Sequence, residues 1–419
     1  MSHFDISVHA IAALCIWLTF DQFYKEPLSI FRFTAFCYST VLLGGVSVIL
    51  LGDSAFGYKM PLDGINKVFM HSLAGLIIMQ GTHLLAKRLL SSVDVRPSTG
   101  NVPASTRWGL GALLALSVFS LLLFAASNGL SLGQQDYEYR YEAARGWGPI
   151  IAFFPAFLPF VFYKIYNSKG IPSFLLVSTI SLVIGLTTYI VMSGYRQILI
   201  GTLIIICCVA MERRYIKRWH FVPGVAAFML LIVSLSFMRY AGDSSGASTF
   251  ESIGIAAYYY IQGDVFPMDA PLKIRDYCDY ITPPGTDVVI NHLAKIVPRA
   301  LWEDKPLILL DAAGFYTQEV VGYARGVTLS PTVLGEGYLV GGSAGFYVLM
   351  FAGAITLTVL DVARKLSDAC FFIIGSFIYG GFFFIREGFS ELLLRALYAA
   401  VFMAIYYCLK TIFSGLPKR

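Results

Sequence analysis

Residues 171–193 read IPSFLLVSTISLVIGLTTYIVMS and contain no Asp, Glu, Lys, Arg or His. About 20 such residues in an α-helix are enough to cross the hydrocarbon core of a bilayer. Ten further stretches are long and apolar enough to be interpreted in the same way, which gives eleven predicted spans. They are residues 4–20, 29–51, 66–86, 108–130, 149–166, 195–211, 220–238, 338–360, 369–385 and 391–412.

The composition of the whole chain agrees with this interpretation. Of its 419 residues 57% are hydrophobic and 14% are charged, and the mean hydropathy is +0.69. An average soluble domain is about 45–50% apolar and about 25% charged. The composition excludes a soluble protein and predicts an all-α polytopic membrane protein. The amino terminus lacks the basic region of a signal peptide, so we expect residues 6–20 to be retained as the first span.

Basic residues gather on one side of the predicted topology. When the eleven spans alternate in direction, 17 of the 31 Lys and Arg residues fall on one side, including Lys87-Arg88 and Arg364-Lys365. The opposite side holds seven, apart from its one long loop. Cytoplasmic loops carry an excess of Lys and Arg. The count therefore predicts a cytoplasmic carboxyl terminus and an amino terminus on the outer side.

One long segment, residues 239–337, interrupts the spans without an apolar run of membrane length. A loop this long is usually functional or disordered, and aromatic groups such as Tyr258-Tyr259-Tyr260 argue against disorder. We expect a cap of short helices over the outer face. The predicted organisation is eight spans in residues 1–238, the loop in 239–337 and three spans in 338–419.

Several kinds of site are not expected in this sequence. The net charge is only +5 and no loop holds a long basic run, so a nucleic-acid partner is not expected. Of seven cysteines, only Cys278 lies in a long polar segment, which argues against a disulfide framework. No CxxC or HExxH motif occurs, and the acidic residues of the long loop do not have the spacing of a calcium-binding loop.

Five cationic residues fall on the predicted outer face and are candidates for binding an anion. Converging Arg and Lys side chains suit a phosphate or diphosphate, because a guanidinium can donate two bonds to phosphoryl oxygens. The alternative is that they extend to lipid headgroups or pair with Glu387 and Glu391. The five residues are Arg196, Arg299, Lys305, Arg386 and Arg395.

Two residues could act as a general base. His292 is the only histidine of the long loop, and imidazole accepts protons near neutral pH; a structural role is the alternative. Glu336 lies in the glycine-rich stretch Gly335-Glu336-Gly337, where glycines allow close backbone approach; the alternative is a helix-capping acid. Trp302 could stack on a sugar ring or anchor the loop at the membrane interface.

Three local motifs resemble those of the Wzy-type O-antigen polymerases, the bacterial polymerases of lipid-linked polysaccharide repeat units. Ser193-Gly194-Tyr195-Arg196 is similar to a turn of that family in which small residues precede an Arg. The stretch Pro298-Arg299-x-x-Trp302-x-x-Lys305-Pro306 resembles its outer-loop signature. Ser330-Pro331, followed by Gly335-Glu336-Gly337 and Gly345, resembles the segment that enters the next span. The likeness covers about residues 170–360.

The resemblance implies a multi-pass protein of the bacterial inner membrane with an architecture similar to the GT-C glycosyltransferases. It implies transfer of a growing glycan from one undecaprenyl diphosphate to the sugar end of another undecaprenyl-linked repeat unit, at the periplasmic face. Donor and acceptor would both be lipid-linked, and neither a metal nor another cofactor would be needed. Membrane lipids and a polysaccharide co-polymerase that regulates chain length are the further partners that it implies.

From these inferences we expect an inverting glycosyl transfer. Arg196, Arg299 and Arg386 would hold the donor diphosphate, Lys305 and Arg395 would be secondary contacts, and either His292 or Glu336 would activate the acceptor hydroxyl.

Two other functions remain open from the sequence. An O-antigen ligase, which moves the finished glycan onto the lipid A core, shares the span number and the large outer loop. A flippase or other transporter usually carries charges in the middle of its spans, and the predicted spans of this chain are nearly free of them there.

Overall fold

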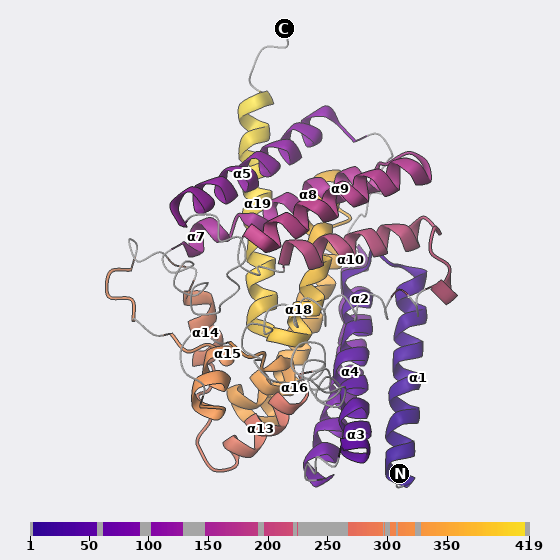
Figure 1. Cartoon of the computed structure of the whole chain (residues 1–419), viewed down its shortest axis with the longest axis vertical. Coiled ribbons are helices and arrows are strands. Elements are labelled where there is room, and N and C mark those ends of the chain that lie inside the picture. Colours follow the sequence, from indigo (N-terminus) through magenta and orange to yellow (C-terminus); the bar gives the residue numbers. More distant parts are fainter. Residues whose placement is uncertain are drawn as a thin grey trace, which may run out of the picture.

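The computed structural model describes the chain as a helical protein (Figure 1). The residues it describes are 3–56, 62–92, 102–128, 147–191, 197–220, 224, 267–295, 297, 302–306, 309–322 and 328–414. Every element of regular structure within these ranges is a helix. The prediction of an all-α chain is confirmed for this part of the protein.

The helices of the first half of the chain are mostly long and apolar. They are α1 (His3–Lys25), α2 (Ile30–Tyr38), α3 (Gly44–Phe56), α4 (Leu62–Leu89), α5 (Ala104–Asn128), α7 (Gly148–Ile151), α8 (Phe157–Tyr166), α9 (Gly170–Val191) and α10 (Gln197–Glu212). A π-helical turn, Ser39–Leu43, joins α2 to α3, and short 3₁₀ turns lie at Leu90–Ser92, Phe154–Ala156 and Arg218–His220.

The second half combines short helices with long ones. They are α13 (Asp269–Cys278), α14 (Asp287–Ala294), α15 (Ala312–Phe315), α16 (Thr332–Ala363), α17 (Asp368–Gly375), α18 (Gly380–Glu387) and α19 (Phe389–Ser414). A π-helical turn at Tyr316–Val320 follows α15, and a 3₁₀ turn at Ser376–Tyr379 joins α17 to α18. The short helices α13, α14 and α15 all fall in the segment expected to form the outer cap.

Eight helical segments within the described ranges are long and apolar enough to cross a membrane. They are Ile6–Lys25, Ile30–Leu50, Asp63–Leu89, Ala104–Ser127, Gly170–Tyr189, Thr332–Ala363, Asp368–Glu387 and Phe389–Thr411. Two more predicted spans appear as shorter apolar helices, Phe154–Tyr166 and Gln197–Glu212. The remaining predicted span, residues 220–238, falls almost wholly outside the described residues. A multi-span helical protein is therefore confirmed, while the count of eleven and the GT-C likeness stay predictions.

The short helices α13 and α14 of this segment pack against long helices that come both before and after them in the chain. α14 packs against α19 and α16, and α13 packs against α16 and α4. In Figure 1, α13, α14 and α15 lie in the same half of the molecule as the start of α1, whereas α19 ends at the opposite end. The helices α5, α9 and α10 run across the direction of α1 and α19 in that view.

Helix α16 is two helices joined by a sharp bend. Gly341 and Gly342 leave helical geometry, and Gly342 has a φ of 63°, which favours glycine. A Cβ added to Gly345 would lie 2.6 Å from the carbonyl oxygen of Gly337. Eight residues of straight helix separate two positions by about 12 Å. The first part, residues 332–340, therefore folds back against the rest of α16. Gly341 and Gly342 permit the bend, and Gly345 permits the close contact with Gly337.

A buried carboxylate also fixes the far end of α16. Asp361 accepts the backbone N–H of Ile30 at 3.0 Å, where α2 begins, and the hydroxyl of Ser29 at 2.5 Å. Its other partner is Arg364, whose Nε lies 2.7 Å away. Orphan N–H groups at a helix start need such an acceptor. Asp361 thus ties α16 to α2.

Candidate functional site

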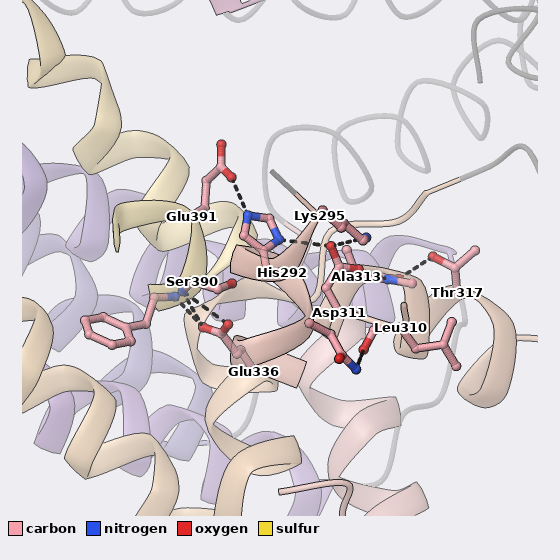
Figure 2. A network of polar contacts seen from close by, with 12 residues as sticks. His292, Lys295, Leu310, Asp311, Ala313, Thr317, Glu336, Ser390 and Glu391 are labelled. Atoms are coloured by element: carbon pink, nitrogen blue, oxygen red, sulfur yellow. Dashed lines mark hydrogen bonds and ion pairs between the residues drawn. The ribbon is translucent and has the colours of Figure 1, made fainter. Parts of the chain in front are cut away.

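The folded-back part of α16 carries Glu336 to the start of α19. Glu336 is fully buried, and its two carboxylate oxygens accept the backbone N–H groups of Phe389 and Ser390, the latter at 3.2 Å (Figure 2). These are the first two residues of α19, whose N–H groups have no partner within their own helix. The interpretation of Glu336 as a helix-capping acid is therefore confirmed, and the helix it caps is α19.

Gly388, the residue before α19, has the conformation that this contact needs. Its φ is +121°, in the region that favours glycine. A Cβ on Gly388 would lie 2.7 Å from the carboxyl carbon of Glu336 and would overlap one of its oxygens. The turn between α18 and α19 can therefore approach Glu336 closely only because position 388 has no side chain.

His292, on α14, bridges two carboxylates. Its Nδ1 lies 2.9 Å from Asp311 Oδ2 and its Nε2 lies 2.9 Å from Glu391 Oε2 (Figure 2). Burial by itself lowers the pKa of His292, but the hydrogen bonds and negative charge of the two carboxylates outweigh it and raise the pKa to about 10. The imidazole is thus a cation at neutral pH, with both N–H groups engaged. Through its contact with Glu391, His292 links α14 to α19.

Asp311 joins the short helices α14 and α15. One carboxylate oxygen accepts the N–H of Gly314 at 2.8 Å and caps α15, while the other contacts both His292 and Lys295. Burial opposes the charged carboxylate, but Lys295 and His292 outweigh it and hold the pKa of Asp311 well below its usual range. Asp311 is therefore ionised at any physiological pH.

Arg395 lies one turn into α19 and is almost completely buried, with 1% of its surface exposed. It pairs with Glu391 one turn earlier and donates to the side-chain oxygen of Gln197, on α10, at 2.8 Å. Its guanidinium carbon lies 5.1 Å from the centre of the Phe383 ring. A buried guanidinium needs such partners, so Arg395 holds Glu391 in position and joins α19 to α10.

Arg386, at the end of α18, belongs to a second small cluster beside the first. Its Nε donates to the hydroxyl of Ser330 at 3.1 Å and lies 3.6 Å from Glu387 Oε1. The hydroxyl of Ser330 donates in turn to the same oxygen of Glu387 at 3.1 Å. Ser330 precedes the folded-back part of α16 by two residues. One short stretch of chain therefore holds the turn between α18 and α19 at both Glu387 and Ser390.

The structure brings together four of the residues predicted for the site. His292, Glu336, Arg386 and Arg395 all contact residues 387–391 or pair with them. The alternative that the arginines pair with Glu387 and Glu391 is confirmed for Arg386 and Arg395.

The other predicted residues lie elsewhere or outside the described ranges. Lys305 donates to the carbonyl oxygens of Lys295 and Val297 at 3.0 and 2.8 Å, next to the end of α14. Trp302 is 37% exposed beside it. Arg196 and Arg299 are outside the described residues.

The sequence named Glu387 and Glu391 as possible partners of the arginines, but it gave no sign of the other partners that organise this site. Asp311 is one of several dispersed acids, and nothing in the local sequence links it to His292, 19 residues earlier. Glu391 and Arg395 stand four positions apart, a spacing that predicts a pair on one helix face. Ser330 belongs to a motif that resembles the family, but nothing in the sequence links it to Arg386 or Glu387. Gln197 carries no sequence signal. Within the described ranges no group of three His, Cys, Asp or Glu residues could hold a metal ion.

Comparison with known proteins identifies the family to which this arrangement belongs. No solved structure matches the chain. The family model of the WzyE protein, O-antigen assembly polymerase, matches residues 85–411. This range contains α14, α15, α16, α18 and all but the last three residues of α19, and with them every described residue of the candidate site. The likeness inferred from three short motifs is thus confirmed over most of the chain, and the protein belongs to the WzyE family of O-antigen assembly polymerases.

Proposed function

We propose that the protein joins undecaprenyl-diphosphate-linked oligosaccharide repeat units into O-antigen or a related surface polysaccharide, at the periplasmic face of the bacterial inner membrane. The observation that carries the proposal is the cluster of cations and carboxylates around the turn between α18 and α19. Ionisable residues at the end of apolar spans are costly and usually functional. The family supplies the reaction class, and the cluster supplies groups suited to it.

The donor in this proposal is already activated. A diphosphate is a good leaving group whose departure chiefly needs neutralisation of the developing charge. Arg386, with Arg196 and Arg299, would bind that diphosphate, and Lys305 would be a secondary contact. Arg395 is too deeply buried to touch a lipid-linked substrate in this arrangement, so we assign it the task of holding Glu391.

The acceptor hydroxyl needs a base that removes its proton. The sequence named His292 and Glu336 for this step. To accept a proton, His292 must first release one of its two carboxylate partners, and Glu336 must release the N–H groups of α19. Both residues would then act mainly by positioning. His292 would hold α14 against α19, and Glu336 would hold the turn between α18 and α19. The expected transfer is inverting and needs no metal.

A deletion strain tests the proposal. Loss of the polymerase should replace the lipopolysaccharide ladder on a silver-stained gel with core bearing one repeat unit, and the wild-type gene should restore the ladder. Arg386→Ala and Arg299→Ala should restore little or none. Lys273→Ala, which removes an exposed cation from α13, should restore it fully.

Other gel patterns contradict the proposal. Loss of every O-antigen band in the deletion strain would indicate a ligase or a flippase. An unchanged ladder would show that O-antigen is not the product. A full ladder from both arginine variants would refute the assigned binding roles.

A further inference from the structure

Four carboxylates surround the start of α19, and three of them have no oxygen to spare. In Glu336 both oxygens accept backbone N–H groups. In Asp311, Oδ1 accepts the N–H of Gly314 and Oδ2 contacts His292 and Lys295. In Glu391, Oε1 pairs with Arg395 and Oε2 with His292.

Glu387 differs from these three. Its Oε1 accepts the hydroxyl of Ser330 and lies 3.6 Å from Arg386 Nε, while its Oε2 contacts no group among the described residues. Its side chain is 27% exposed, compared with 8% for Glu391 and 7% for Asp311. Glu387 therefore has both an available oxygen and access to the surroundings of the site.

The position of Glu387 is nevertheless fixed. The Ser330 hydroxyl accepts the N–H of Arg386, so its single proton points to Glu387 Oε1. On the carboxyl side, Gly388 and the cap from Glu336 hold the next residues. A catalytic group must be held within a fraction of an ångström of its working geometry. A carboxylate anchored through one oxygen and open at the other meets this need.

We propose that Glu387 is the general base of the polymerase, a role that rests on the function proposed above. An acceptor hydroxyl that donates to Oε2 loses its proton to Glu387 as its oxygen attacks C1 of the donor sugar. The bond from that hydroxyl oxygen to C1 forms while the bond from C1 to the diphosphate oxygen breaks. Undecaprenyl diphosphate leaves with the electron pair, and the proton ends on Glu387. Release of this proton to water restores the carboxylate.

Kinetic measurements can distinguish a general base at position 387 from a residue that only pairs with Arg386. A pairing residue neutralises the cation, so its loss should change the binding of an anionic lipid. A base takes part only when the hydroxyl reacts, so its loss should lower kcat and leave KM nearly unchanged. General base catalysis contributes about 10²- to 10⁴-fold to a rate.

The test uses full-length protein in proteoliposomes and, as substrate, the undecaprenyl-linked repeat unit extracted from the polymerase deletion strain. Glu387→Gln keeps the size of the side chain and an oxygen for Ser330. We expect kcat to fall about 10²- to 10⁴-fold with KM within about threefold of wild type. Asp276→Asn, which neutralises an exposed carboxylate on α13, should keep wild-type kcat and KM.

A pH profile gives a second readout that a structural role would not produce. The kcat of the wild type should fall towards acidic pH as the base becomes protonated, and the residual kcat of Glu387→Gln should lack this acidic limb. Glu387→Asp retains a carboxylate on a shorter side chain, so it should recover part of the rate and the acidic limb. This variant also tests the proposal if Glu387→Gln does not fold.

Each failure has a distinct signature. Wild-type protein that makes no polymer from this substrate refutes the proposed function itself. A wild type that polymerises while Glu387→Gln keeps its kcat, or is impaired only in KM, refutes Glu387 as the base and leaves the polymerase function standing. An acidic limb that persists in Glu387→Gln also overturns the assignment.

Discussion

Replacing Glu336 with alanine should release the start of α19. The change removes the acceptor of two backbone N–H groups, those of Phe389 and Ser390. An unsatisfied buried donor costs about 1–3 kcal/mol. Ser390 is only 2% exposed, whereas Phe389 is partly exposed and can turn to water. Counting the cost for the Ser390 N–H in full and that for the Phe389 N–H in part, we expect Glu336→Ala to lower the free energy of unfolding by about 2–4 kcal/mol.

Glutamine at position 336 refines this expectation. Glu336→Gln keeps one carbonyl oxygen that can accept one of the two N–H groups, but it loses the negative charge that favours a helix start. It should therefore cost about 1–2 kcal/mol, less than alanine. Thermal unfolding in detergent should rank the proteins as wild type, glutamine, alanine. Hydrogen exchange of the peptide that contains Phe389 and Ser390 should accelerate in the same order.

A carboxylate at the other end of α16 provides the control. Asp361→Ala removes the acceptor of Ile30 at the start of α2, so it should also lower the unfolding temperature. It should leave exchange at Phe389 and Ser390 unchanged. If Glu336→Ala unfolds at the wild-type temperature with these two amides still protected, Glu336 does not hold the start of α19.

Two further predictions concern the same region. Gly388→Ala places a Cβ against the Glu336 carboxylate at a φ of +121°, so it should cost about as much as Glu336→Ala, and the double variant should be little worse than either in thermal unfolding. His292 has a folded pKa of about 10, above an unfolded value of about 6.5. Its contacts with Asp311 and Glu391 should therefore stabilise the protein fully below about pH 6.5, and this contribution should be lost as pH rises towards 10. Unfolding temperatures measured across this range should show that dependence in wild type and much less of it in His292→Gln; equal slopes would exclude the charged bridge.

The spans were the part of the structure most readily predicted from sequence. Residues 171–193 appear as α9, Gly170–Val191, and residues 391–412 lie within α19, Phe389–Ser414. Both predictions rest on one local property, because a segment in lipid must be apolar over its whole length and satisfy its own backbone hydrogen bonds. No knowledge of neighbouring helices is needed for that step.

The bend in α16 could be predicted only in part. The stretch Gly335-Glu336-Gly337 indicated close backbone approach, which the contact between Gly337 and Gly345 confirms. The sequence nevertheless placed the start of the span at 338, whereas the helix begins at Thr332 and reverses at Gly341. The mean hydropathy of a segment gives no sign that the chain reverses within it, since both parts of α16 are apolar. The direction of residues 332–340 depends on what they pack against.

The capping role of Glu336 shows the same limit at the level of one side chain. A capping acid is recognised in a sequence by its position just before its own helix. Glu336 caps a helix that begins 53 residues later. His292 and Glu391 are 99 residues apart. No local pattern reports such pairs. Glu387 and Glu391 were expected as partners only of the nearby arginines, and the partners of His292 and Glu336 were not predicted.

The charges of the assembled site change what the cations can be expected to do. The described cluster holds four carboxylates, those of Asp311, Glu336, Glu387 and Glu391. It also holds four cations: Lys295, Arg386, Arg395 and the protonated His292. With every one of these groups charged the cluster is close to neutral, so the diphosphate binding proposed for Arg386 would need further cations, and Arg196, Arg299 and Lys305 are the ones that we propose.

Proton transfer to Glu387 would alter this balance during the reaction. In the proposed mechanism Glu387 becomes neutral as the diphosphate oxygen takes up negative charge. Arg386, 3.6 Å from Glu387 Oε1, then loses the counter-charge of Glu387 when the leaving group needs a cation. An interaction that strengthens only as the bond breaks stabilises the transition state rather than the bound substrate. The pairing of Arg386 with Glu387 in the resting protein is thus compatible with a catalytic role for both.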